Sequence, residues 1–152
     1  MKKIFAVFIL IIIMFALFKI GVFEYDSPVK INTTLRVTEN NIEWMVQLYE
    51  NGDVAIQPIG ALPANIIIPE KIEGHTVTHI AEYAFSGYTN IKTVEIPDSV
   101  RAIGDYAFWG CESLVSVSLS NQITKLSENI FLGCSTKLLD NIKKHYPQIE
   151  WK

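Results

Sequence analysis

The feature of this sequence that most limits its fold is an internal repeat of 23 residues. Residues 77–99 form one copy, residues 100–122 form a second, and residues 123–134 begin a third. The same kinds of side chain recur in phase: Val77, Val100 and Ile123; Ile80, Ile103 and Leu126; Phe85, Phe108 and Phe131; Gly87, Gly110 and Gly133. A period of this length indicates a repeat protein, in which successive turns stack and bury their apolar positions against one another.

Each copy contains a short strand pattern. Residues 114–119 read LVSVSL, and Val117 and Leu119 share one face because side chains alternate along a strand. No copy has room for this strand together with a full helix, which needs about 10–12 residues. We therefore predict a β-rich solenoid of about three turns, in which each turn makes a short parallel strand and returns through a second short segment. The recurring glycine suits a tight bend with positive φ.

The motifs also point to a family. Residues 96–119, IPDSVRAIGDYAFWGCESLVSVSL, resemble the BspA-type leucine-rich repeat, a family of bacterial and protist surface proteins, in the elements I-P, V-x-x-I-G and A-F-x-G-C. The resemblance covers residues 50–134, with the repeats at about 66–134. It implies a leucine-rich repeat (LRR) fold and a role in adhesion or surface interaction. Many relatives have long arrays, so a chain with so few turns is expected to be a small module.

Both ends of the repeat region carry patterns suited to closing a core. Residues 43–59 hold two alternating runs around an Asn-Gly pair, the strongest short hairpin signal, which predicts an N-terminal β-hairpin cap. After the repeats, apolar residues at helical spacing run up to Pro147 and predict a C-terminal helix cap. Residues 24–42 are polar and patternless and are expected to form a stalk. The LRR domain with its caps would then span residues 43–152.

The N-terminus carries a long apolar run that favours a membrane location. Lys2 and Lys3 precede it, and residues 4–23 would span about 30 Å as a helix, enough to cross a bilayer. We therefore predict a signal-anchor helix over residues 1–23, a single pass through the cell membrane and an extracellular C-terminal domain. No A-x-A-like site follows the run, which favours a retained anchor; secretion after signal cleavage is the alternative.

Charge and motif content argue against several function classes. Without the three lysines of the N-terminal segment, the chain has 10 basic and 16 acidic residues, a poor balance for binding nucleic acid. No phosphate-binding glycine motif is present, and we expect no cofactor. His75 and His79 are four residues apart, but His79 aligns with Ala102 and Lys125 in a variable, solvent-facing slot. We therefore expect no metal site.

The two cysteines leave two interpretations open. Cys111 and Cys134 occupy the same slot in adjacent turns, so their Cα atoms would lie about 5 Å apart, within reach of a disulfide. Side chains in stacked slots run parallel, however, and the default is a pair of buried free thiols. His145 is distant in sequence from both, so we expect no catalytic residues.

The outward strand positions are the best candidates for a binding site. Thr93 and Glu95 in one turn, and Ser116 and Ser118 in the next, should lie side by side on a polar sheet face of the kind that repeat proteins use for binding. Trp109 is the fifth candidate, because its slot holds serine and leucine in the other copies and the core does not require an aromatic there.

These features favour a non-catalytic, extracellular LRR binding module that recognises a protein or a glycan. A structural subunit of a larger membrane-associated assembly is the alternative, and the oligomeric state separates the two. An enzyme is not expected, since a hidden hydrolase or metalloprotein would need a bound metal.

Overall fold

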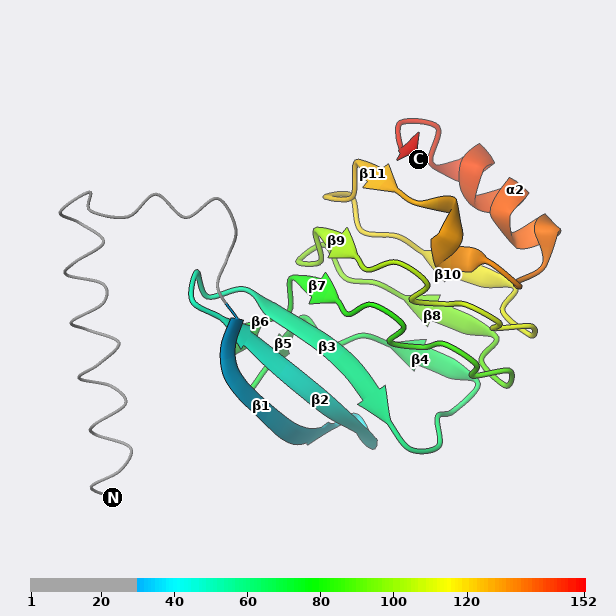
Figure 1. Cartoon of the computed structure of the whole chain (residues 1–152). Helices are drawn as coiled ribbons and strands as arrows, with labels where there is room; N and C mark the ends of the chain where they lie inside the picture. Colours follow the sequence, from blue (N-terminus) through cyan, green and yellow to red (C-terminus); the bar gives the residue numbers. More distant parts are fainter. Residues whose placement is uncertain (1–29) are drawn as a thin grey trace, which may run out of the picture.

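The computed structural model describes residues 30–152 of the chain. The signal-anchor helix predicted over residues 1–23 lies outside the described residues and stays a prediction. Within the described part, no helix has the length and apolar character that crossing a membrane requires. Figure 1 shows this part as a coil of short strands, with a longer antiparallel hairpin at one end and a helix at the other.

Two columns of short parallel strands run through the repeats (Figure 1). The first column is a three-stranded sheet of β4 (Asn65–Ile67), β8 (Thr93–Glu95) and β10 (Ser116–Ser118). The second column contains β7 (His79–Ile80), β9 (Ala102–Ile103) and β11 (Lys125–Leu126), of which β7 and β9 pair directly. Val94 pairs with Val117, so the strands are offset by the 23-residue period. The chain has the repeat, solenoid-like fold that the sequence predicts.

Backbone hydrogen bonds also join the bends between the two columns. The Gly87 N–H donates to the carbonyl of Trp109 over 2.7 Å, and the equivalent Gly110 N–H donates to the carbonyl of Leu132 over 2.8 Å. The two glycines have φ values of 76° and 69°, a region that side chains with a Cβ rarely occupy. The tight bend with positive φ predicted for this slot is confirmed.

The core is a stack of equivalent side chains from successive turns. Phe85, Phe108 and Phe131 lie nearly parallel, with ring centroids 5.0 and 5.6 Å apart. Trp44 from the hairpin meets Phe85 edge-on, with centroids 6.3 Å apart, and closes the N-terminal end of the stack. All four rings are buried. Offset-stacked and edge-to-face pairs are favourable beyond their area burial, so this aromatic column ties the hairpin to the turns.

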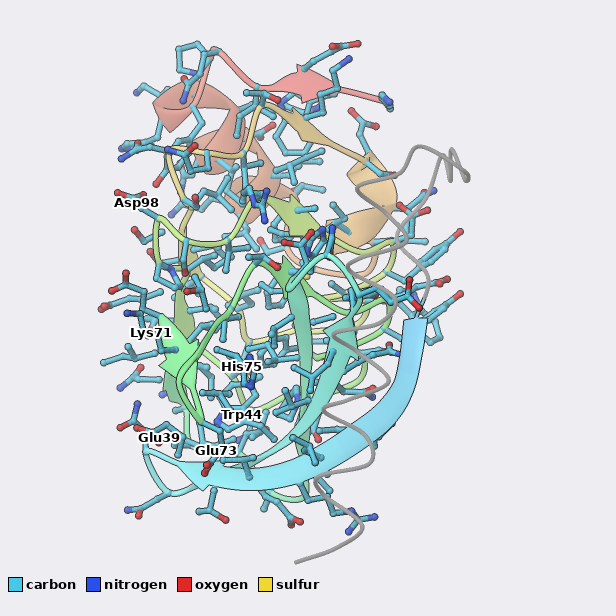
Figure 2. All side chains as sticks on the ribbon, turned by 90° about the vertical axis from the view of Figure 1, so that its left-hand side faces the viewer. Glu39, Trp44, Lys71, Glu73, His75 and Asp98 are labelled. Atoms are coloured by element: carbon cyan, nitrogen blue, oxygen red, sulfur yellow. The ribbon has the colours of Figure 1, made fainter. Side chains whose placement is uncertain are left out.

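The N-terminal end of the domain is an antiparallel sheet. The predicted hairpin is present as β2 (Ile42–Tyr49) and β3 (Val54–Ile59). β3 then pairs in parallel with β7, so the hairpin and the second column belong to one sheet. A small additional hairpin, β5 (Lys71–Ile72) and β6 (His75–Thr76), precedes β7. Figure 2 shows the described part after a 90° turn and labels Glu73 and His75 of this small hairpin.

The expectation of a patternless stalk over residues 24–42 is wrong for residues 30–39. They form β1 (Lys30–Glu39), which pairs antiparallel with β2. Asn40 and Asn41 make the connecting turn with φ values of 54° and 60°, which asparagine tolerates better than most residues. Residues 30–39 therefore belong to the same sheet as the hairpin, while residues 24–29 lie outside the description.

The C-terminal end is built from a helix and one short strand. The 3₁₀ turn η1 (Glu128–Phe131) is followed by α2 (Thr136–His145), which buries Leu138 and Ile142 among the core residues. β12 (Glu150–Trp151) pairs in parallel with β11 and extends the second column. In Figure 1, α2 lies beside β10, at the end of the first column.

Phe108 is the middle ring of the aromatic column, so its truncation should be costly. We expect Phe108→Ala to lower the free energy of unfolding by about 3–5 kcal/mol, because it opens a cavity between two stacked rings. Urea denaturation of the full-length chain, followed by circular dichroism, measures this loss. The adjacent Trp109 is 48% exposed, and Trp109→Ala should cost less than about 1 kcal/mol. Equal losses would contradict a fold centred on the column.

Candidate functional site

The outward side chains of the three-stranded sheet form two rows. Each row takes one residue from each strand: Asn65, Thr93 and Ser116 in the first, and Ile67, Glu95 and Ser118 in the second. We call these six residues the strand face. All are exposed except Thr93, which is half-buried, while the residues between the rows point into the core. The structure thus brings together the four strand residues singled out by sequence, and their role in binding stays a prediction.

Two members of the strand face, Asn65 and Ile67, are not among the binding residues predicted from the sequence. β4 precedes the first complete repeat, and its segment shares with the next turn only the Ile-Pro pair that ends the strand. That pair is the signal that could have found them, because aligning Ile68 with Ile96 places Asn65 opposite Thr93. The Thr93 hydroxyl donates to Asn65 Oδ1 over 3.0 Å, so the first row is internally ordered.

The strand face combines hydrogen-bonding groups, one carboxylate and one apolar side chain. Ile67 is 58% exposed, which is unusual for a large aliphatic residue on a sheet, and Glu95 carries the single charge of the face. With strands about 4.8 Å apart and alternate residues about 6.6 Å apart, the face measures roughly 10 by 7 Å. An open surface of this kind suits contact with side chains of another macromolecule, since it encloses no ligand.

Trp109 lies in the bend between β9 and β10 and not on the strand face. Leu132 fills the equivalent position one turn later and is 51% exposed. Tyr106 precedes Trp109 by three residues, and Tyr83 is its equivalent one turn earlier. The two tyrosines stack on each other, with ring centroids 5.0 Å apart and planes 6° from parallel. Both tyrosines have positive φ, at 56° and 58°. The structure therefore separates the fifth predicted residue from the other four and places it in a bend, one turn before the exposed Leu132.

Comparison with known proteins identifies the repeat. Residues 64–150, more than half of the chain, match the family model of the BspA type leucine rich repeat region, in six copies. The chain belongs to this family. The family typically consists of non-enzymatic binding proteins, which agrees with an exposed, open candidate site. No curated protein matches the sequence.

Solved structures of bacterial LRR proteins share the fold. A leucine rich cell surface protein from Faecalibacterium prausnitzii is 30% identical, with a TM-score of 0.55 over 68% of this chain and 26% of that one. A T. pallidum LRR protein is 22% identical, with a TM-score of 0.54 over 74% of this chain and 48% of that one. A Bacteroides capillosus LRR protein is 20% identical, with a TM-score of 0.52 over 80% and 99%. The chain spans less than half the length of the first two.

The cysteines of this LRR domain are free thiols, which resolves the two interpretations left open by the sequence. Each thiol donates to the phenylalanine carbonyl of the preceding turn, Cys111 to Phe85 and Cys134 to Phe108, both over 3.1 Å. Burial is the main cause that raises the pKa of Cys111 to about 12, and it also raises the pKa of Cys134. Both groups therefore act as hydrogen-bond donors between turns and are poor nucleophiles.

The thiol pKa values predict slow labelling of the folded chain. For Cys111, the shift from 9.0 to about 12 lowers the thiolate fraction about a thousandfold, so iodoacetamide should react with it far more slowly than with the urea-unfolded chain. Mass spectrometry of the full-length chain at successive times measures both rates. Fast labelling of folded Cys111, or a disulfide between Cys111 and Cys134 after purification without reductant, would contradict this assignment.

The expectation of a solvent-facing His79 is wrong. This residue is half-buried on β7, with Nδ1 2.8 Å from the Thr78 hydroxyl and its ring 6.0 Å from the ring of Tyr49. The hairpin lies against this residue, because β3 pairs with β7 and Tyr49 is on β2. A comparison of the repeats with one another cannot reveal this contact, since the hairpin is outside them. Burial lowers the pKa of His79, with Asp53 acting in the opposite direction and Arg101 adding to the decrease. In residues 30–152, no cluster of three or more His, Cys, Asp or Glu could hold a metal ion.

The lowered pKa of His79 predicts a pH-dependent stability. Below pH 6.5 the unfolded chain takes up a proton at this histidine before the folded chain does, so the unfolded state gains free energy of protonation. The free energy of unfolding should therefore fall as the pH drops below 6.5, until the folded group also titrates. Urea denaturation above and below pH 6.5 should show a smaller fall in His79→Gln than in the wild type. His75→Gln, on the exposed β6, should retain the wild-type fall; an identical response of both variants would refute the assignment.

Proposed function

We propose that this LRR domain is a non-catalytic binding module that contacts a protein partner through its strand face. The observation that carries this proposal is that three turns place six outward side chains in two registered rows across one sheet. Family membership supports this reading, because leucine-rich repeats generally mediate protein interactions. The chemistry of the face also favours a protein, since Ile67 offers apolar contact while Glu95 and the hydroxyls offer hydrogen bonds.

The size of the face indicates a modest interface. A stable protein complex buries about 800 Å² on each partner, which is far more than a patch of roughly 10 by 7 Å can provide. A partner must therefore extend beyond the strand face or bind weakly. Trp109 is well suited to contribute, because a half-exposed tryptophan near an interface often dominates its energy. The strand face would thus determine which partner binds, and the neighbouring bends would supply the rest of the buried area.

The proposed location of this module is the outer face of the cell membrane. The support comes from the sequence, in which residues 4–23 are apolar apart from Lys19 and follow two lysines. The F. prausnitzii neighbour is described as a cell surface protein, which agrees with this location. The tethered module would bind partners outside the cell, and a glycan is the alternative ligand class.

Charge reversal on the central strand tests the strand face. We expect Thr93→Lys/Glu95→Lys to reduce capture of the partner by about tenfold or more, because two lysines place large cations in the middle of both rows. The measurement uses the purified full-length chain in mild detergent, cross-linked to solubilised surface proteins of the source organism. Quantitative mass spectrometry compares the proteins captured by the wild type and the variant.

A matched variant keeps this test specific. Glu73→Lys/Gln148→Lys adds the same net charge at exposed positions away from the face, on the β5–β6 turn and near the C-terminus. It should capture the same partner as the wild type. Equal capture by the face variant and the wild type would remove the strand face from the site, and the absence of any captured protein would argue against a binding module.

A further inference from the structure

The first column of strands ends at β10 without a further strand beside it. Among the described residues, β10 pairs only with β8. The repeat period would place the next strand at residues 139–141, but these residues belong to α2. Backbone groups inside a helix are bonded to one another, so a helix cannot complete the hydrogen bonds of a strand edge. The outer edge of β10 is therefore left without a strand partner.

The direction of the backbone groups on β10 follows from the bonds that it makes. The Ser116 N–H donates to the carbonyl of Lys92, and the Ile96 N–H donates to the carbonyl of Ser118. Residues 116 and 118 thus direct their backbone groups toward β8. Because this direction alternates along a strand, the N–H and C=O of Val117 point to the opposite side, toward α2.

Only part of this edge is covered by the protein itself. The Leu119 N–H has the same outward direction as that of Val117, and it donates to the Tyr146 hydroxyl over 3.0 Å. In the described part of the chain, no bond from a turn, a loop or a side chain reaches the N–H or the C=O of Val117. A donor and an acceptor on one residue, facing outward from a strand, match the backbone of a second extended chain.

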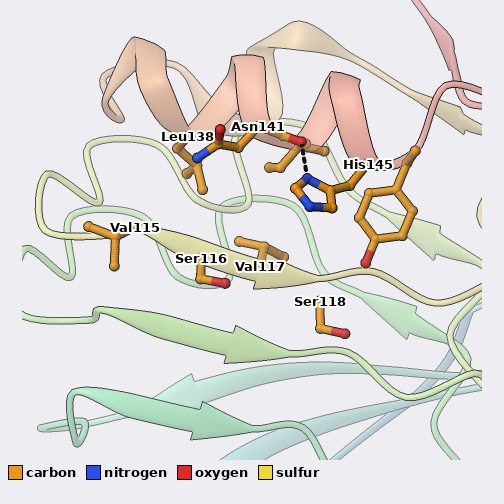
Figure 3. A pocket seen from close by; sticks show the side chains of 9 residues that line it. Val115, Ser116, Val117, Ser118, Leu138, Asn141 and His145 are labelled. Atoms are coloured by element: carbon orange, nitrogen blue, oxygen red, sulfur yellow. Dashed lines mark hydrogen bonds between the residues drawn. The ribbon is translucent and has the colours of Figure 1, made fainter.

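These groups face a groove between β10 and α2 (Figure 3). The groove has a volume of about 250 Å³ and is lined on one side by residues 115–118. On the other side, α2 and the residue after it contribute Leu138, Asn141, Ile142, His145 and Tyr146. Val115 at its mouth is 63% exposed. The volume lies below the ~300–1,000 Å³ that is usual for small-molecule sites, so the groove suits side chains of a docked segment.

We propose that this groove binds an extended peptide segment of another protein, which adds a strand to the first column beside Val117. The backbone of the segment would pair with the N–H and C=O of Val117, and every second side chain would enter the groove against Leu138 and Ile142. The segment should therefore alternate apolar residues with polar ones. This site is the outer edge of β10 and shares only Ser116 and Ser118 with the strand face. It therefore goes beyond the function proposed above and does not depend on it.

Two other possibilities are less well supported by the structure. The opposite edge of the sheet, at β4, also has a hollow, but the turn residues Asn40 and Asn41 and the ring of Pro63 line it in place of an apolar helix wall. A second copy of this chain could pair its own β10 with the β10 edge. Each β10 has an α2 beside it, however, so the two α2 helices would have to pass each other for the strands to meet. A single extended segment needs only the width of one strand, about 4.8 Å.

A synthetic peptide with the sequence of residues 91–96, Ile-Lys-Thr-Val-Glu-Ile, is a suitable probe, because it is the strand that already pairs with this part of β10 on its other edge. Binding of the fluorescein-labelled peptide to the full-length chain in mild detergent is followed by anisotropy. Two further peptides carry N-methyl groups on alternate amides, one on each of the two sets. Strand addition predicts that one set abolishes binding and that the other preserves it.

Variants of the protein provide the second arm. Val115→Lys should weaken binding by about tenfold or more, because an edge lysine opposes strand addition, whereas Ile67→Lys at the β4 edge should bind as the wild type does. Both positions are exposed, so neither change should prevent folding, which circular dichroism checks. Thr93→Lys/Glu95→Lys should also retain peptide binding, which separates this site from the strand face. The Val117 amide should exchange with D₂O more slowly when the peptide is bound.

Several results would overturn the proposal. The absence of peptide binding at millimolar concentration would do so, as would equal effects of the two N-methylated sets. Undiminished binding by Val115→Lys would place the peptide elsewhere. A dimer of the chain that Val115→Lys disrupts, together with no peptide binding, would make a second copy the occupant of the groove.

Discussion

The stacking of equivalent positions in successive turns is the interaction on which the rest of this structure depends. No single 23-residue turn can bury its own apolar side, so Phe108 is buried only because Phe85 and Phe131 lie on either side of it. The same period aligns the outward residues into rows and sets the thiols of Cys111 and Cys134 against the phenylalanine carbonyl of the turn before. Core, surface rows and inter-turn bonds are three consequences of one repeat length.

Features that depend on the repeat itself could be predicted from sequence. The offset between Val94 and Val117, the bend with positive φ at Gly110, and the adjacency of Thr93 with Ser116 all follow from aligning one turn with the next. The Asn-Gly pair was sufficient for the hairpin because that turn chemistry is local. In each case, the physical cause lies within one or two turns of the chain.

The features that sequence reasoning missed depend on contacts that an alignment of the repeats does not contain. Leu35 and Val37 alternate before Asn40 in β1, but their polar neighbours hide the strand until its partner β2 is known. His79 occupies a slot that is half-buried here, where β3 pairs with β7 and the ring of Tyr49 on β2 lies against the imidazole. The free state of Cys111 was undecided for a related reason, since spacing sets the distance between stacked thiols but not the carbonyl that each of them meets.

The two columns of strands are also closed differently where the stack ends. At the N-terminal end, β3 continues the second column with a strand, so the backbone edge of β7 is paired and Trp44 covers the aromatic column. At the C-terminal end, α2 supplies apolar side chains for the core, but a helix offers no backbone groups to a strand edge. Tyr146 compensates at one position only. A helix can therefore close the core of such a stack while leaving its sheet open, and the groove beside β10 follows from that difference.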